Sequence, residues 1–182
     1  MEVYTISRSD IDFDGFFNKE SNFNGHLVCP ENFGWVKFKS DLKVVGLISF
    51  KAGSGIEAGE GIKAGEGIEA GEGIEAGWGI KAGWGIKAGL GIEAGFSILA
   101  KTVSSKLRIF AGLTIRKIPS LIEMEIKVEK VISGEIAYGK LVIVEPKKQE
   151  IKNIEVIKIG DLTFDKAEVE KLLSNLKPIK AN

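Results

Sequence analysis

Residues 58–69 read AGEGIKAGEGIE, and this six-residue phrase, Ala-Gly-X-Gly-Ile-Glu/Lys, repeats between residues 53 and 95. A period this short is typical of a chain that coils into a solenoid, in which each coil packs on the next. We therefore expect a short parallel β-solenoid over residues 44–101. Isoleucines recur at every sixth position, and the same phase extends back to Val44 and Phe50: Ile56, Ile62, Ile68, Ile74, Ile80, Ile86, Ile92 and Ile98.

Each phrase contains an Ile-Glu/Lys-Ala triplet that alternates apolar, charged and apolar residues. In a short strand this alternation directs isoleucine and alanine inward and the charged residue outward. Glycine on both sides of X permits positive φ or close backbone approach, so we expect the corners of the coil there. Each buried isoleucine contributes about 1.5–3 kcal/mol, and the isoleucine column is therefore the main stabilising feature of the repeat.

The length of one coil is open between two forms, a three-sided coil made of three phrases and a flatter coil made of two. The three-phrase coil stacks Glu57 on Glu75 and Lys63 on Lys81, whereas the two-phrase coil stacks Lys63 on Glu75. Exposed charge pairs contribute little to stability, so they do not decide the question. We favour the three-sided form, with about three coils and a height of roughly 15 Å.

The segments on either side of the repeat have a different composition. Residues 1–43 combine aromatic residues with turn-forming dipeptides, and we expect an irregular cap that covers the open strand edge of the solenoid. Residues 106–164 carry a lysine- and isoleucine-rich strand pattern, which we interpret as an antiparallel β module. Gly160-Asp161, between two apolar runs, predicts a hairpin turn in this module.

The C-terminal end carries the pattern of a helix. Asp165 and Glu168 resemble a capping box, the apolar residues from Val169 to Leu176 line one helical face, and Pro178 follows. The expected fold class is therefore mainly β, with a short parallel β-helix, an antiparallel β module and a C-terminal α-helix. The expected regions are 1–43, 44–101 and 102–182.

Charge and cysteine content limit the classes of function. Lysine plus arginine equals aspartate plus glutamate, 25 against 25, so no overall field attracts nucleic acid or an anionic membrane. Cys29 is the single cysteine, which excludes an intramolecular disulfide and favours a reducing compartment. The N-terminus lacks the pattern of a secretory signal, and no apolar run is long enough for a membrane span. We expect a cytoplasmic protein with no membrane partner.

Catalytic and metal-binding patterns are weak. His26 and Cys29 have the spacing of two metal ligands, but a structural zinc site needs four and no cluster completes the set. No nucleophile, base and orienting acid can be combined from the sequence. We therefore expect no metal or cofactor and no enzymatic activity.

The solenoid changes character along its length. Residues 57–75 contain six glutamates and Lys63, whereas in residues 78–96 the X position becomes aromatic or leucine. Surface aromatic residues beside lysines are typical of binding hot spots. The alternative is that these aromatic residues pack beneath the C-terminal strands while the glutamates are merely solvated. We predict a protein-binding surface that comprises Trp78, Trp84, Lys81 and Lys87.

The Gly-X-Gly-Ile spacing over residues 44–99 resembles that of hexapeptide-repeat proteins, a class that includes acyltransferases with left-handed β-helices. Those enzymes have a small residue at the position that X occupies here and a histidine near the coils, whereas the single histidine, His26, precedes this repeat. The chain also resembles bactofilins, whose β-helices form cytoskeletal filaments. That resemblance implies self-assembly into a homo-oligomer.

The X-position carboxylates Glu60, Glu66 and Glu72 suggest a further alternative. A carboxylate array resembles that of β-helical proteins that imitate DNA, including pentapeptide-repeat gyrase inhibitors, and of phage anti-CRISPR proteins. The resemblance implies an inhibitor of a host nucleic-acid-binding protein, encoded by a phage or mobile element, although a three-sided coil places these three glutamates on different sides. Our first hypothesis remains a non-enzymatic scaffold or protein-binding module, with such an inhibitor and a self-assembling structural protein as alternatives.

Overall fold

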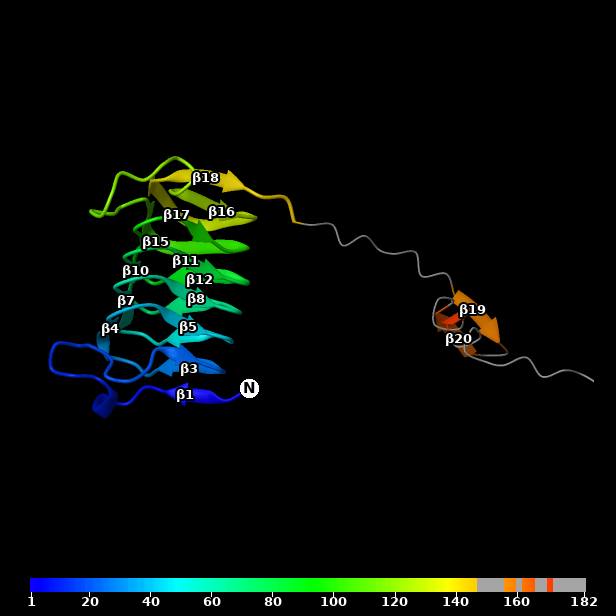
Figure 1. Cartoon of the computed structure of the whole chain (residues 1–182), viewed down its shortest axis with the longest axis horizontal. Helices are drawn as coiled ribbons and strands as arrows, with labels where there is room; N and C mark the ends of the chain where they lie inside the picture. The colour runs from blue at the N-terminus through cyan, green and yellow to red at the C-terminus, as the bar shows by residue number, and fades with distance from the viewer. Residues whose placement is uncertain (147–155, 160–161, 166–169, 172–182) are drawn as a thin grey trace, which may run out of the picture. The chain divides into compact units, whose positions relative to one another are not determined.

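The computed structural model describes residues 1–146, 156–159, 162–165 and 170–171. The chain divides into two compact units, Met1–Glu145 and Pro146–Asn182. In the first unit, parallel strands stack like the rungs of a ladder, as Figure 1 shows. The prediction of a mainly β protein with a parallel β-solenoid is confirmed.

The solenoid has three faces, and we name each after its outward side chains. The lysine face is a seven-stranded sheet formed by β2 (Asn22–Phe23), β5 (Leu42–Val44), β8 (Ile62–Ala64), β11 (Ile80–Ala82), β14 (Ile98–Leu99), β16 (Glu125–Val128) and β18 (Lys140–Ile143). The glutamate face contains β4 (Gly34–Phe38), β7 (Ser54–Ala58), β10 (Ile74–Ala76) and β13 (Ile92–Ala94). The mixed face contains β1 (Val3–Thr5), β3 (His26–Cys29), β6 (Ile48–Phe50), β9 (Ile68–Ala70) and β12 (Gly85–Ala88).

Two long strands, β15 (Thr102–Ala111) and β17 (Lys130–Tyr138), bend around the corner between the mixed and glutamate faces. The first part of β15 pairs with β12, and its last part pairs with β13. β15 therefore joins the mixed and glutamate faces into one continuous sheet, which has eleven strands with β17, the strand that pairs with β15.

The strand register gives the length of one coil. Ile74 pairs with Ile56 on one side and with Ile92 on the other, so that three phrases make one coil of the repeat, as the three-sided form predicts. Earlier coils are longer, and Val44 consequently pairs with Ala64. Val44 thus occupies an alanine position of the core, and the isoleucine phase expected there is wrong by two residues.

The core is the predicted column of isoleucines and alanines. Every repeat isoleucine from Ile56 to Ile98 exposes 1% or less of its surface, and the alanines that follow are buried as well. Between residues 53 and 95 only Gly53 has positive φ. The glycine after each alanine is required by close approach instead: a Cβ on Gly89 would lie 1.8 Å from the carbonyl oxygen of Gly71.

Residues 1–43 continue the solenoid, which corrects the expectation of an irregular cap. β1 pairs with β3 and β2 pairs with β5, both in parallel. Aromatic rings replace isoleucine in the core of this end: Phe17 lies within 6.2 Å of Tyr4, Phe23 and Phe38, measured between ring centroids. A 3-10 helix, η1 (Arg8–Asp10), follows β1. The aromatic cluster thus fills the first coils as part of the same core.

The expected antiparallel module is wrong for residues 102–143, because β15, β16, β17 and β18 pair in parallel with the preceding coils. Alternating side chains look alike in parallel and antiparallel strands, so the pattern could not distinguish them. The period was also interrupted, since residues 112–124 leave the coil and Ile98 pairs with Ile126. Seven rungs on one face give a height of roughly 30 Å, twice that expected.

The second unit contains the predicted hairpin, in which β19 (Val156–Ile159) pairs antiparallel with β20 (Leu162–Asp165). Its turn, Gly160-Asp161, lies outside the described residues. So does most of the C-terminal helix expected after Asp165; only Glu170 and Lys171 are described and helical there, and such a helix is not supported. In the described part of the chain, no helix has the length and apolar character needed to cross a membrane.

Candidate binding surface

The outward side chains of the lysine face form a ladder of like charges. Lys63 lies directly between Lys43 and Lys81 on neighbouring strands, and Lys63 and Lys81 are exposed. The next rung carries Leu99, and Lys127 follows it. Neighbouring strands are about 4.8 Å apart, so three consecutive ammonium groups project from one flat surface.

The two central lysines have no charged partner within the described residues. Lys43 pairs with Asp41, with 2.6 Å between Nζ and Oδ2, whereas no ion pair is found for Lys63 or Lys81 within the described ranges. Like charges directly opposite each other in a sheet are destabilising. This part of the ladder therefore carries a cost that an anionic partner would relieve.

At the end of the lysine face, one carboxylate is shared by two lysines and partly neutralises them. Glu125 accepts hydrogen bonds from both Lys127 and Lys140, at 2.7 and 3.0 Å. These two ammonium groups lower the pKa of Glu125 below its ordinary value. Among the ladder lysines of the described chain, Lys63 and Lys81 are thus the two that form no ion pair.

Two tryptophans lie at the corners on either side of β11. Trp78 precedes this strand and Trp84 follows it, with Lys81 between them, and the two residues expose 45% and 60% of their surface. The structure therefore brings these three predicted residues together on one rung. Exposed aromatic residues that flank a positive charge form the pattern that binding hot spots favour.

A loop covers the corner between the glutamate and lysine faces. Phe96 occupies the same corner as Trp78 in the next coil, and its backbone amide donates a hydrogen bond to the Trp78 carbonyl at 2.8 Å. In the loop that leaves the coil, the Arg116 guanidinium lies 5.6 Å from the Trp78 ring and the Lys117 ammonium 5.4 Å from the Phe96 ring. Trp84, at the opposite corner, has no such cover among the described residues.

The lysine face is also hollowed. One hollow of about 270 Å³ is lined by Lys43, Lys63, Lys81 and Leu99 among others. A second, of about 550 Å³, shares Lys43 and Lys63 and extends to Phe23. Both hollows follow the ladder, so a ligand seated there meets the ammonium groups together with apolar surface.

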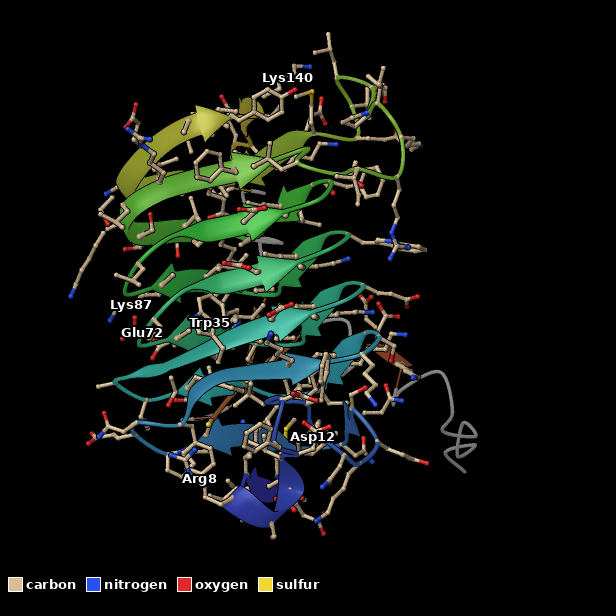
Figure 2. The ribbon with its side chains drawn as sticks, turned by 90° about the vertical axis from the view of Figure 1, so that its left-hand side faces the viewer. Arg8, Asp12, Trp35, Glu72, Lys87 and Lys140 are labelled. Carbon is tan, nitrogen blue, oxygen red and sulfur yellow. The ribbon has the colours of Figure 1, made fainter. Side chains whose placement is uncertain are left out.

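The remaining predicted residues are not part of this rung. Lys87 lies on the mixed face between Glu69 and Ser104. Glu72 lies at the corner between the mixed and glutamate faces, and Figure 2 shows Glu72 and Lys87 at the same edge of the solenoid. Lys81 and Lys87 therefore project from different faces of the solenoid, and the structure does not bring them together on one face.

The three X-position glutamates lie at three different corners, as the three-sided coil predicts. Each is joined to the X residue of the next coil by a backbone hydrogen bond from that residue's amide to the glutamate carbonyl: Trp78 to Glu60 at 3.0 Å, Trp84 to Glu66 at 3.1 Å and Leu90 to Glu72 at 3.1 Å. Glu60 and Glu66 consequently flank Lys63 at the two edges of the lysine face. They cannot form one carboxylate array with Glu72.

A true carboxylate row occurs on the glutamate face instead, where Glu75 lies between Glu57 and Glu93. Lys37 approaches Glu57 at 3.5 Å from the rung before. Loss of hydration raises the pKa of Glu75 above its ordinary value, and the like charges of Glu93 and Glu57 add to the effect. The row of like charges therefore disfavours the ionised form of Glu75.

His26 and Cys29 do not form a ligand pair. The Cys29 side chain is fully buried in the core, and this burial raises the pKa of its thiol to about 11. His26 is partly exposed, and its Nδ1 accepts a hydrogen bond from the Leu47 amide at 2.9 Å. Among the described residues no group of three or more metal-ligating side chains is found.

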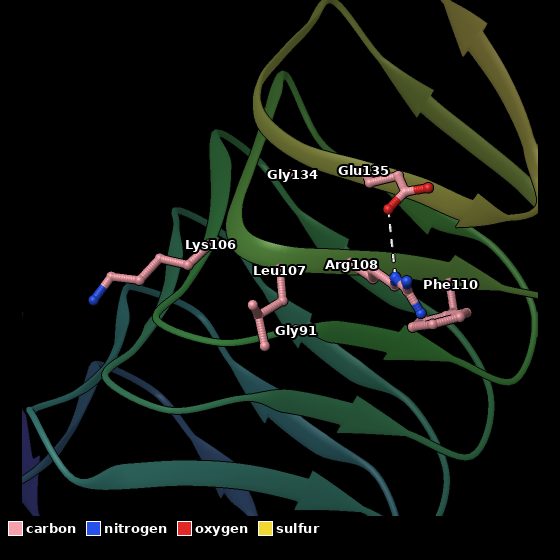
Figure 3. A pocket seen from close by; sticks show the side chains of 7 residues that line it. All are labelled: Gly91, Lys106, Leu107, Arg108, Phe110, Gly134 and Glu135. Carbon is pink, nitrogen blue, oxygen red and sulfur yellow. Dashed lines mark hydrogen bonds and ion pairs between the residues drawn. The ribbon is translucent and has the colours of Figure 1, made fainter.

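A further hollow, of about 710 Å³, lies where β15 bends, and Figure 3 shows the residues that line it. Arg108 and Glu135 are partners on the neighbouring strands β15 and β17, with 3.4 Å between Nε and Oε2. Their charges satisfy each other, and the Lys106 side chain extends away. We therefore place no ligand in this hollow.

The ladder itself is the feature that the sequence prediction missed as a site. Its signal was present, because Lys63 and Lys81 are three phrases apart and a three-phrase coil had to stack them. The place of Lys43 on the ladder could not be predicted, because Lys43 precedes the regular repeat and lies in a coil longer than those of the repeat.

No protein-family model, curated protein or solved structure matches this chain. The resemblances to hexapeptide-repeat proteins and bactofilins therefore have no support beyond the repeat pattern and the solenoid fold.

Proposed function

We propose that this chain is a non-catalytic scaffold whose lysine face binds an acidic surface of a protein. The observation that carries the proposal is the unpaired, like-charged pair Lys63 and Lys81 beside two exposed tryptophans. The solenoid fixes the backbone positions of these residues before binding, so the ordering entropy lost on association is mainly that of the side chains.

A protein fits this surface better than a nucleic acid does. The carboxylates of Glu60 and Glu66 stand at both edges of the ladder, so an anionic ligand fits only where its charges stay within the width of the ladder. A duplex carries phosphates over its whole surface, so it also meets these edge carboxylates and is repelled there. A protein surface can instead present its own donors to those edges and an apolar group to Trp84. The balanced total charge also gives no general attraction to nucleic acid.

The test is a titration of the purified full chain with labelled poly-L-glutamate and, separately, with duplex DNA at low salt. We expect binding of poly-L-glutamate that weakens as salt screens the charges. The variant K63E/K81E should bind at least about tenfold more weakly, and W78S/W84S should also lose affinity.

The matched control is K51E/K87E, which makes the same change in charge at exposed lysines off the lysine face. Its affinity should stay close to that of the wild type. Equal losses in the two charge-reversal variants, or binding of duplex DNA alone, would refute the proposal.

A second candidate is the inhibitor of a nucleic-acid-binding protein. The row Glu57, Glu75 and Glu93 favours it, because these carboxylates share one face whereas Glu60, Glu66 and Glu72 do not. In this case E75Q/E93Q, and not K63E/K81E, should abolish binding to a basic probe such as poly-L-lysine.

A further inference from the structure

The lysine and glutamate faces are matched in geometry. Each carries three like charges on successive rungs: Lys43, Lys63 and Lys81 on one face, Glu57, Glu75 and Glu93 on the other. Both ladders have the rung spacing of the same solenoid, about 4.8 Å. Two such rows, laid side by side, therefore stay in register over their whole length.

Neither row is neutralised within its own molecule. Lys63 and Lys81 form no ion pair in the described part of the chain, and the same holds for Glu75 and Glu93; the pairs at the row ends are Lys43 with Asp41 and Lys37 with Glu57. The two rows point out of different faces of a rigid prism, so they cannot meet each other in one molecule. A second copy can bring them together.

We propose that the acidic surface bound by the lysine face is the glutamate face of a second copy of this chain. This inference rests on the proposed function. The contact relieves like-charge repulsion in both rows at once. With 25 basic and 25 acidic residues, no net charge keeps the copies apart.

The contact joins two different surfaces, so it is heterologous. Each bound copy still offers a free lysine face or a free glutamate face, and the association continues into a ring or an open chain. Trp78 lies at the corner that the two faces share, and its neighbour Trp84 lies at the far edge of the lysine face. The tryptophans thus border the contact, where they exclude water from the charge pairs.

The proposal is tested by sedimentation velocity on the full chain over a range of protein and salt concentrations. The wild type should form species larger than a dimer at low salt and dissociate at about 0.5 M salt, where the screening length is a few ångströms. A wild-type chain that remains monomeric at every concentration at low salt overturns the inference.

Charge-reversal variants identify the surfaces. K63E/K81E has two acidic faces and E75K/E93K has two basic faces, so each alone should associate at least about tenfold more weakly than the wild type. An equimolar mixture of the two restores opposite charges at every contact and should associate again. Failure of the mixture, with both variants folded by circular dichroism, contradicts the proposal.

The outcomes separate this inference from the proposed function. If the monomeric wild type binds poly-L-glutamate but not itself, the lysine face binds acidic proteins and a second copy is not its partner. If the chain binds neither, both proposals fail. The control K51E/K87E leaves both rows intact. If it associates as weakly as K63E/K81E, total charge and not the two rows controls association.

Discussion

The lysine face and the glutamate face share one core and differ in one side chain per rung. Beneath both lie isoleucine and alanine at the same positions, and the outward residue is Lys63 or Lys81 on one face and Glu75 or Glu93 on the other. The inward isoleucine and alanine repeat in every phrase and determine the coil. Because three phrases make one coil, only every third phrase contributes its outward charged residue to a given face. The binding surface can therefore change while the scaffold beneath it stays the same.

The largest effects should be equal on the two faces, because they depend on the shared core. Ile80→Ala beneath the lysine face and Ile74→Ala beneath the glutamate face each remove a fully buried side chain. Each should lower the free energy of unfolding by about 2–5 kcal/mol in urea denaturation. A large loss on one face alone would show that the two faces do not share one continuous core.

Corner glycines should come next. A Cβ on Gly83 would lie 2.0 Å from the carbonyl oxygen of Gly65, and one on Gly77 would lie 2.3 Å from that of Gly59. Gly83→Ala and Gly77→Ala should each cost more than about 1 kcal/mol, since the backbone must shift. Gly79→Ala, where the nearest atom is 3.1 Å away, is the control and should cost clearly less.

The tryptophans should distinguish the two edges of the lysine face. Trp78→Ser removes a ring that the Arg116 guanidinium covers, and we expect a loss of about 0.5–1 kcal/mol from this contact. Trp84→Ser should leave stability within about 0.5 kcal/mol, because that residue is the more exposed one. Thermal unfolding of both variants gives the comparison, and a larger loss for Trp84→Ser would contradict the arrangement of the loop.

The smallest effect should be on the glutamate face and should depend on pH. The pKa of Glu75 is raised in the folded state, so ionisation of this carboxyl lowers the free energy of unfolding. The contribution of the protonated carboxyl to stability is fully present at acid pH and is lost as the pH rises through the folded-state pKa. Glu75→Gln should therefore stabilise the chain by a few tenths of a kcal/mol at pH 7 and lose this advantage below about pH 4.

Glu69→Gln is the matched control for this prediction, because Glu69 lies opposite Lys87 on the mixed face. It should not stabilise the chain at pH 7. If both variants behave alike in urea denaturation across pH, neither the lost hydration of Glu75 nor its like-charged neighbours is the cause.

The sequence was sufficient for the solenoid because the isoleucine period is a property of local residues. It could not show that β15 to β18 continue the coils, since parallel and antiparallel strands share one alternation and residues 112–124 interrupt the period. Trp78, Lys81 and Trp84 were predictable as neighbours in sequence. Lys43 and Lys127 were not, because their place on the lysine face depends on coils of irregular length.

The most direct test of the account is the cross-linking of cysteine pairs in the coils. In a three-phrase coil, K63C and K81C lie on neighbouring strands at a distance that a disulfide can span, whereas K63C and E75C lie on different faces. The buried Cys29, with its raised pKa, should not compete. Mass spectrometry after mild oxidation should find a cross-link in K63C/K81C and none in K63C/E75C, and the opposite result would contradict the three-sided coil and both charged faces with it.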